Sequence, residues 1–162
     1  MAETKYGKYF IRELEPKKAR GPGALIARLD DEVIKGSNFY FVFLMPEIPA
    51  PKELVGHPPH IHKDAELLFH IGTNPDDPTD LGAEVELCMG PEMERHIITK
   101  SCVVYIPPGF IHCPWQPLRT YRPWVFIEVN QGPLHTEKFY PQLMTKEQRE
   151  QTDWSRWKDE GY

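Results

Sequence analysis

Apolar residues recur along the chain in short runs, without the broad stripes of amphipathic helices. The runs are rich in Val, Ile, Phe and Tyr, and Gly, Pro, Asn or Asp bound each of them. They cover residues 8–14, 24–30, 38–45, 59–62, 66–72, 83–90, 95–100, 102–107, 110–115 and 123–130. About ten short strands at this spacing are typical of a β-sandwich or β-barrel, so the pattern predicts an all-β fold.

The C-terminal tail has a different pattern. Thr145 and Gln148 have the spacing of a capping box, and a helix over 145–157 would place Trp154 and Trp157 on one face. We expect a short helix there that covers an open end or an edge of the sheet.

No internal repeat and no long linker divides the 162 residues. The sequence therefore predicts a single domain over 1–162. Its barrel core is expected at about 38–130, preceded by strands within 8–30 and followed by the helical tail.

Composition narrows the classes of function. The net charge of −5, with no basic run of five or six residues, argues against a nucleic-acid or anionic-membrane partner. The N-terminal MAETKYGKYF has charges where a signal peptide needs an apolar stretch, and three cysteines without a CxxC indicate reduced thiols. The expected location is therefore cytoplasmic.

One stretch concentrates histidines and acids at the start of a strand: HPPHIHKDAELLFHIG, residues 57–72. Strand side chains alternate, so His60 and His62 point to the same face. If the strand that begins at Glu66 pairs back as a hairpin, its carboxylate lies opposite the two imidazoles. Two imidazoles and a carboxylate are typical ligands of a divalent transition metal, although each residue alone would be read as a solvated surface group.

A second segment, VVYIPPGFIHCPW, adds a further histidine. Its Pro-Pro-Gly turn at residues 107–109 reverses the chain tightly, so His112 returns on the next strand and can face inward. The two segments together predict four ligands for one metal.

These two segments resemble the two motifs of the cupins, which are small jelly-roll β-barrels. The first motif, G-x5-H-x-H-x3-4-E-x6-G, is matched at His60, His62, Glu66 and Gly72. The second, G-x5-P-x-G-x2-H-x3-N, is matched at Pro107, Gly109 and His112. Leu54, Ser101 and Gln116 depart from the motifs, and Gly72 comes one residue early, but all four positions lie at turns or motif edges.

The resemblance implies a cupin jelly-roll barrel that binds one metal through His60, His62, Glu66 and His112. Four protein ligands leave two octahedral positions for water, dioxygen or a chelating substrate. Dioxygenase chemistry with Fe or Mn on a small oxygenated substrate is the leading expectation, and isomerase, decarboxylase or lyase chemistry follows; Zn or Ni would fit the same ligands. The alternative is a non-enzymatic cupin that binds a small molecule or is stabilised by its metal.

Other residues are weaker candidates. Glu128, within an apolar strand, is a candidate general base, and an edge-strand acid facing solvent is the equal alternative. His70 shares the face of Glu66 and is a candidate catalytic residue, although a buried histidine bonded to a backbone carbonyl is slightly favoured. Residues expected to line a pocket, or to form core instead, are Phe110, Trp115, Gln116 and Trp124, with Tyr105 as a further aromatic candidate.

Assembly is expected to involve the N-terminal run KYFIREL. An exposed edge strand at 8–14 is able to pair across a two-fold axis, so the sequence predicts a homodimer.

Overall fold

Antiparallel strands make up most of the regular secondary structure of the described residues. The computed structural model describes residues 4–11, 23–48 and 56–162. The strands are β1 (Ala24–Leu29), β2 (Phe39–Met45), β3 (His60–Ile61), β4 (Glu66–Ile71), β5 (Asp80–Met89), β6 (Glu94–Lys100), β7 (Cys102–Ile106), β8 (His112–Thr120), β9 (Trp124–Asn130) and β10 (Lys138–Phe139). The helical elements are the 3-10 turns η1 (Gly7–Tyr9) and η2 (Pro141–Leu143) and the helix α1 (Lys146–Gln151).

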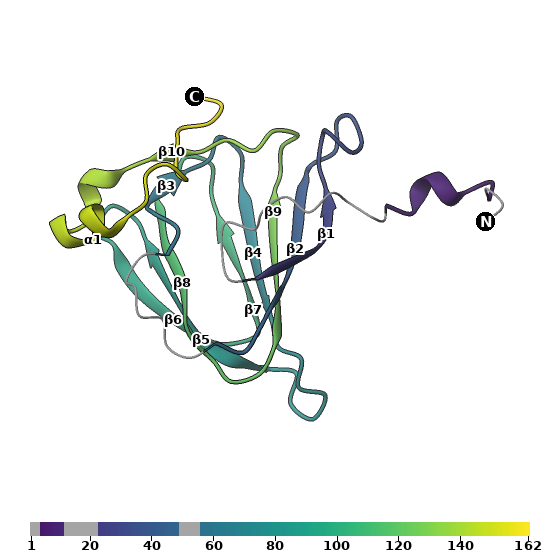
Figure 1. Ribbon diagram of the computed structural model, residues 1–162, viewed down its shortest axis with the longest axis horizontal. Helices are drawn as coiled ribbons and strands as arrows, with labels where there is room; N and C mark the ends of the chain where they lie inside the picture. The colour runs from purple at the N-terminus through teal and green to yellow at the C-terminus, as the bar shows by residue number, and fades with distance from the viewer. Residues whose placement is uncertain (1–3, 12–22, 49–55) are drawn as a thin grey trace.

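The strands form two five-stranded sheets that face each other (Figure 1). The β9 sheet has the order β1-β2-β9-β4-β7, and the β8 sheet has the order β10-β3-β8-β5-β6. From β2 to β5, and again from β6 to β10, successive strands switch between the sheets, which is how a jelly roll is built. The prediction of an all-β barrel with a short C-terminal helix is confirmed.

The hydrophobic core lies between the two sheets. It is built from alternate residues of facing strands: Met45, Leu68, Leu81, Ala83, Val85, Leu87, Ile106, Cys113, Trp124 and Phe126. The alternation is visible along β4, where buried Glu66, Leu68 and His70 alternate with more exposed neighbours. The interior thus changes from apolar in the middle to polar where β4 begins.

The predicted strand at 8–14 is wrong where the structure describes it. Residues 8 and 9 belong to the turn η1, and residues 10 and 11 are not in a strand. Residues 12–14 lie outside the described residues. The hydrophobic side chains here are exposed, Tyr9 by 67% and Phe10 by 60%, so no strand pairing or burial supports an extended conformation.

The tail helix begins as predicted and ends earlier than predicted. Thr145 and Gln148 form the capping box in both directions. The helix ends at Gln151, because the Asp153 carboxylate accepts hydrogen bonds from the backbone N–H and hydroxyl of Ser155, and such local bonds compete with a helix. Trp154 and Trp157 therefore lie beyond the helix.

Two further expectations, on membrane-spanning segments and on the cysteines, can be compared with the structure. None of the helices in the described part of the chain has the length and apolar character needed to cross a bilayer. Cys88, Cys102 and Cys113 are free thiols, as predicted. The two-residue strand β10 was missed, since its register depends on a partner, β3, far away in the sequence.

Candidate metal centre

Both sheets contribute to the site at one end of the barrel. His60 of β3 and His112 of β8 are direct partners in the β8 sheet, and His62 follows β3 immediately. Glu66 opens β4 in the opposite sheet. The expected β3–β4 hairpin is therefore wrong, because β3 and β4 lie in different sheets. The Glu66 carboxylate reaches the imidazoles from across the barrel, where side chains of the two facing sheets pack together.

The Pro-Pro-Gly turn takes the chain from the β9 sheet to the β8 sheet. Gly109 has φ +71°, a conformation that favours glycine, and its backbone N–H donates to the carbonyl of His62 at 2.8 Å. This bond ties the turn that precedes His112 to the segment that carries the other two histidines. The predicted return of His112 toward the interior is what the structure shows.

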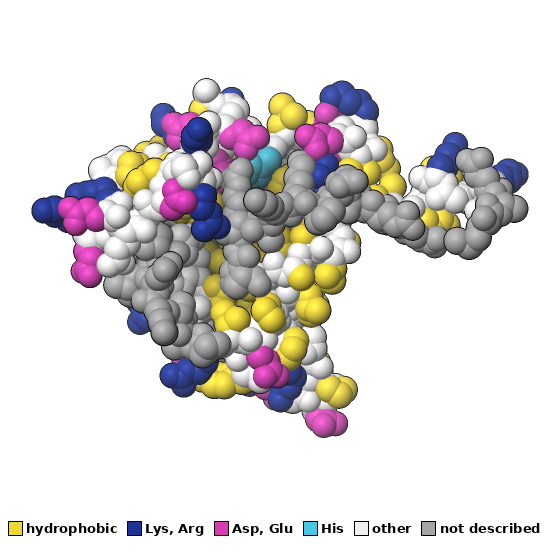
Figure 2. Space-filling view, viewed as in Figure 1, with side chains coloured by type: hydrophobic (Ala, Val, Ile, Leu, Met, Phe, Trp, Pro, Cys, Tyr) yellow, Lys and Arg dark blue, Asp and Glu magenta, His cyan; other side chains and the backbone are white. Residues whose placement is uncertain are grey.

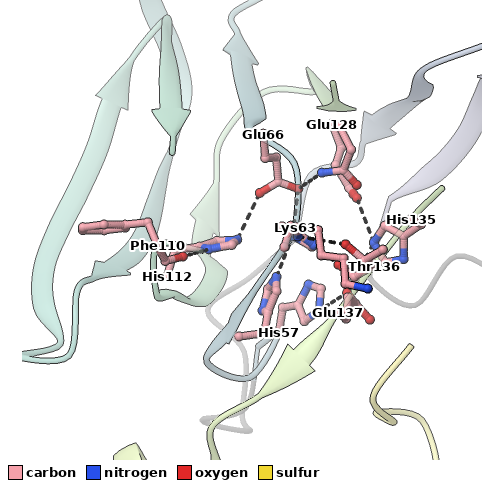
Figure 3. A network of polar contacts seen from close by, with 12 residues as sticks. His57, Lys63, Glu66, Phe110, His112, Glu128, His135, Thr136 and Glu137 are labelled. Atoms are coloured by element: carbon pink, nitrogen blue, oxygen red, sulfur yellow. Dashed lines mark hydrogen bonds and ion pairs between the residues drawn. The ribbon is translucent and has the colours of Figure 1, made fainter. Parts of the chain in front are cut away.

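The four predicted ligands lie together and are almost fully buried. The Nε2 atoms of His60 and His62 are 3.0 Å apart. The Glu66 carboxylate places Oε1 3.3 Å from Nε2 of His62 and Oε2 3.0 Å from Nε2 of His112. Figure 3 shows Glu66 and His112 pointing toward each other from their separate strands. None of the four residues is more than 3% exposed.

Backbone carbonyls orient all three rings through their Nδ1 atoms. The acceptors are the oxygens of Pro58 for His60 (2.8 Å), of Thr136 for His62, and of Phe110 for His112 (3.2 Å). Donation to a carbonyl requires the proton on Nδ1, so in the neutral ring Nε2 carries a free lone pair. Carbonyl partners of this kind commonly fix the tautomer of metal-binding histidines.

The Glu66 carboxylate has its own support. Asn130 is its direct partner on the neighbouring strand β9, and the Asn130 amide donates to Oε1 at 3.1 Å. Both side chains are buried, so this hydrogen bond limits the rotation of the carboxylate.

Burial and neighbouring charges shift the pKa values of the cluster. Burial, together with the nearby His112, holds the pKa of His60 well below its usual value. Burial opposes the charge on His62, but the contact with Glu66 outweighs it and raises the His62 pKa to about 9. Burial would raise the pKa of Glu66, but His112 and His62 hold it well below its usual range. In the metal-free site His62 is thus a positively charged imidazolium beside an ionised Glu66.

The geometry fits a metal ion. Nitrogen atoms of His60, His62 and His112 lie within 4.8 Å of one another. Ligands about 2.1 Å from one ion are separated by roughly 3.0 Å in neighbouring octahedral positions. The spacings of 3.0 Å between the two imidazoles and between His112 and Glu66 match this value. The cluster is therefore a candidate site for a divalent ion.

Glu128 and His70 lie at different depths of the barrel. Strand β9 is central in its sheet, so Glu128 is not an edge-strand residue; its side chain is 19% exposed and lies 3.8 Å from Nε2 of His135. His70 is fully buried, and its Nε2 accepts a hydrogen bond from the Trp115 indole at 3.0 Å. Four residues along a strand separate it from Glu66 by about 13 Å. Burial lowers the pKa of His70 to about 4, so the ring is neutral.

The residues expected to line a pocket take different positions. Trp124 is fully buried in the core, where it stacks on His70. Trp115 packs against Phe126 with ring centroids 4.5 Å apart, and Gln116 is 8% exposed. Phe110 is 37% exposed and Tyr105 is 56% exposed, so both reach the surface.

Three residues beside the site were not predicted to take part in it. The His57 side chain is 25% exposed and stacks on both His60 and Trp157. Its Nε2 lies 3.0 Å from Oε1 of buried Glu137, and Nε2 of His135 lies 3.5 Å from the same oxygen. The alternation in LHTEKF is the sequence signal for His135 and Glu137 sharing a face, although nothing local shows that this face meets the barrel.

Sequence comparison and structure comparison give different results. No protein-family model matches the sequence, and no curated protein matches it. A recombinant oxalate oxidase in complex with glycolate matches in structure with a TM-score of 0.51 and 14% identity, over 83% of this chain and 64% of that chain. The Lactobacillus farciminis oxalate decarboxylase formate complex matches with a TM-score of 0.50 and 13% identity, over 80% of this chain and 34% of that chain. Both neighbours are cupins.

This chain has the cupin fold. The two facing sheets and the likeness to these barrels agree with the two sequence motifs. At such low identity the likeness concerns the fold alone, and the cupin barrel described here spans 64% of the oxidase chain and 34% of the decarboxylase chain.

Proposed function

We propose that this cupin is a metal-dependent enzyme that acts on a small oxygenated organic substrate. The metal is a divalent transition ion, Fe or Mn in preference to Zn or Ni, held by His60, His62, Glu66 and His112. The observation that carries the proposal is the set of three Nδ1–carbonyl contacts, which turns three Nε2 atoms toward one buried region beside an ionised carboxylate. Each of the three can give a lone pair to a metal once His62 has lost its extra proton. The oxalate-converting neighbours support a small organic acid as the substrate class.

Each residue of the site has a definite task. The histidines and Glu66 hold the ion, and Asn130 keeps the carboxylate turned toward it through the 3.1 Å hydrogen bond. Bound to this set, an Fe or Mn ion supplies Lewis acidity and redox chemistry toward a coordinated oxygen ligand. The buried apolar side chains of Leu68 and Phe126 exclude water from the interior below the site, which strengthens electrostatic interactions there.

Glu128 is the best placed residue to move a proton. It is on β9, two residues before Asn130, so both side chains point to the interior face of the sheet. Its carboxylate lies 3.8 Å from His135, and its charge contributes to the raised pKa of His62. We assign it the role of general base or acid toward the substrate. His70, neutral and engaged by Trp115, acts through packing.

Dioxygenase chemistry is the first candidate reaction. Decarboxylation is the second, and the observation that favours it is Glu128 beside His135. In its protonated form the Glu128 carboxyl group could donate its proton to the carbanion that loss of carbon dioxide leaves, and it would then take up a proton from water for the next turnover. The two reactions differ in whether dioxygen is consumed.

The test uses protein loaded separately with Fe and with Mn. Oxygen uptake and product mass spectrometry are measured over a panel of hydroxy acids, keto acids, diacids, phenols and diketones, with and without air. Glu128→Gln is expected to lose most turnover while retaining its metal. Relaxation of water protons by bound Mn should show exchangeable water. A Mn-loaded protein without exchangeable water and without turnover would leave a structural metal cupin.

A further inference from the structure

A second cluster of imidazole and carboxylate groups lies beside the metal centre. His135 and Glu137 alternate on the extended segment that leads into β10, so their side chains share one side. Glu160, near the C-terminus, is the antiparallel bridge partner of Glu137, and their backbones exchange hydrogen bonds of 2.9 and 2.8 Å. We call His135, Glu137 and Glu160 the tail site.

The bridge places two glutamates directly opposite each other. Such partners point to the same side with their Cβ atoms about 5 Å apart, and like charges in this position destabilise the pair. Glu137 has no exposed surface, which makes an ionised carboxylate there costly without a cation close by. A cation between the two strands would offset both costs.

His135 lies between the two carboxylates. Its Nε2 is 3.5 Å from Oε1 of Glu137, and its Nδ1 is 3.4 Å from Oε2 of Glu160. One ligand atom from each of the three residues falls within a set that spans no more than 4.8 Å. Figure 3 shows His135 and Glu137 on either side of Thr136, next to the ligands of the metal centre.

We propose that the tail site binds a second divalent metal ion, with Zn²⁺ as the best match to one imidazole and two carboxylates. The ion supplies the positive charge that the opposed glutamates need, and His57, 3.0 Å from Oε1 of Glu137, orients that carboxylate from outside.

The ion connects the C-terminal segment to the metal centre. It ties Glu160 to the segment whose middle residue, Thr136, orients His62 through its carbonyl. On the same segment as Glu160, Trp157 stacks on His57, which in turn stacks on His60. Filling the tail site thus holds the C-terminal segment against the mouth of the barrel.

The test counts bound zinc by elemental analysis after dialysis against Zn²⁺. Wild type is expected to hold two ions and Glu160→Gln one. Glu150→Gln is the matched control, because it makes the same charge change at an exposed residue of helix α1, and it should hold two. His112→Ala should lose the ion of the metal centre and keep that of the tail site.

Limited proteolysis provides a second measurement. Zn²⁺ should slow cleavage of the C-terminal segment at least several-fold in wild type and in Glu150→Gln, and should have no such effect in Glu160→Gln. Equal zinc content in wild type and Glu160→Gln would overturn the tail site and leave a histidine bridging two carboxylates. If wild type binds one ion, and that ion is lost in Glu160→Gln but kept in His112→Ala, the result would support the tail site and refute the metal centre.

Discussion

Removing the amide of Asn130 tests how the protein holds Glu66. Asn130→Ala deletes a buried 3.1 Å hydrogen bond to a carboxylate that lies 3.0 to 3.3 Å from two imidazoles. A hydrogen bond to a charged group contributes about 1.5–3 kcal/mol to stability, so the free energy of unfolding of the metal-free protein should fall by about that amount. The substitution leaves every predicted metal ligand in place.

Metal affinity should fall as well, because the carboxylate is then free to rotate away from the ion. Loss of a supporting group of this kind typically weakens metal binding by about 10–100-fold, or about 1.4–2.7 kcal/mol. Competition with a chromophoric chelator gives the dissociation constant, and urea unfolding gives the stability. Gln131→Ala, which changes the next residue at an exposed position, is the control and should alter neither quantity.

The two measurements separate the possible outcomes. Wild-type metal affinity in Asn130→Ala, with reduced stability, would mean that Glu66 is not held for a metal and that the amide serves only folding. Unchanged values for both quantities would refute the contribution of this hydrogen bond altogether.

Four other predictions concern the ligands, the pH and the assembly. His62→Ala should abolish stoichiometric metal at the centre and lower the thermal midpoint of the metal-loaded protein, because binding energy is part of folding energy; unchanged metal content in this variant would contradict the assignment. Below the His62 pKa of about 9 the metal must displace one proton from this ring to bind. The apparent metal affinity, measured by chelator competition, should therefore rise about tenfold per pH unit between roughly pH 6 and 8. An affinity that does not change with pH would contradict the raised His62 pKa. Because that pKa is raised from 6.5, its contribution to the stability of the metal-free fold is complete below pH 6.5 and lost as the pH rises toward 9, which urea unfolding across this range checks. The homodimer stays a prediction, supported by the hydrophobic side chains that Figure 2 shows gathered over the side where the β9 sheet lies. Ile26 of β1 and Leu44 of β2 are exposed. Light scattering at micromolar concentration decides, since a monomeric mass would rule the dimer out.

The ligand set could be predicted from sequence because each part of the argument was local. The alternation of His60 and His62 requires only that the segment be extended, and the turn before His112 requires only its prolines and glycine. The local sequence does not show to which sheet Glu66 belongs. The short connection between β3 and β4 suggested a hairpin, but the buried face of β4 packs across the barrel instead of pairing with β3.

The tail site was beyond the reach of local patterns for the same reason. His135 and Glu137 form the tail site together with Glu160. The antiparallel backbone bridge between Glu137 and Glu160 brings Glu160 to them, and the local sequence does not show that bridge. The end of helix α1 shows the opposite case, because Asp153 and Ser155 carried a local signal that the spacing of the tryptophans obscured. Features that depend on one segment of the sequence could therefore be predicted, whereas contacts between distant segments could not.

The contact between His62 and the carbonyl of Thr136 spans 74 residues of sequence. During synthesis the HxH motif leaves the ribosome early, while His112, Thr136 and Glu160 follow much later. Until they emerge, His60, His62 and Glu66 lack the fourth ligand, His112, and the carbonyl that turns His62. A metal ion would meet only an incomplete set of ligands on the nascent chain. Selection of the right ion is therefore left to the completed barrel.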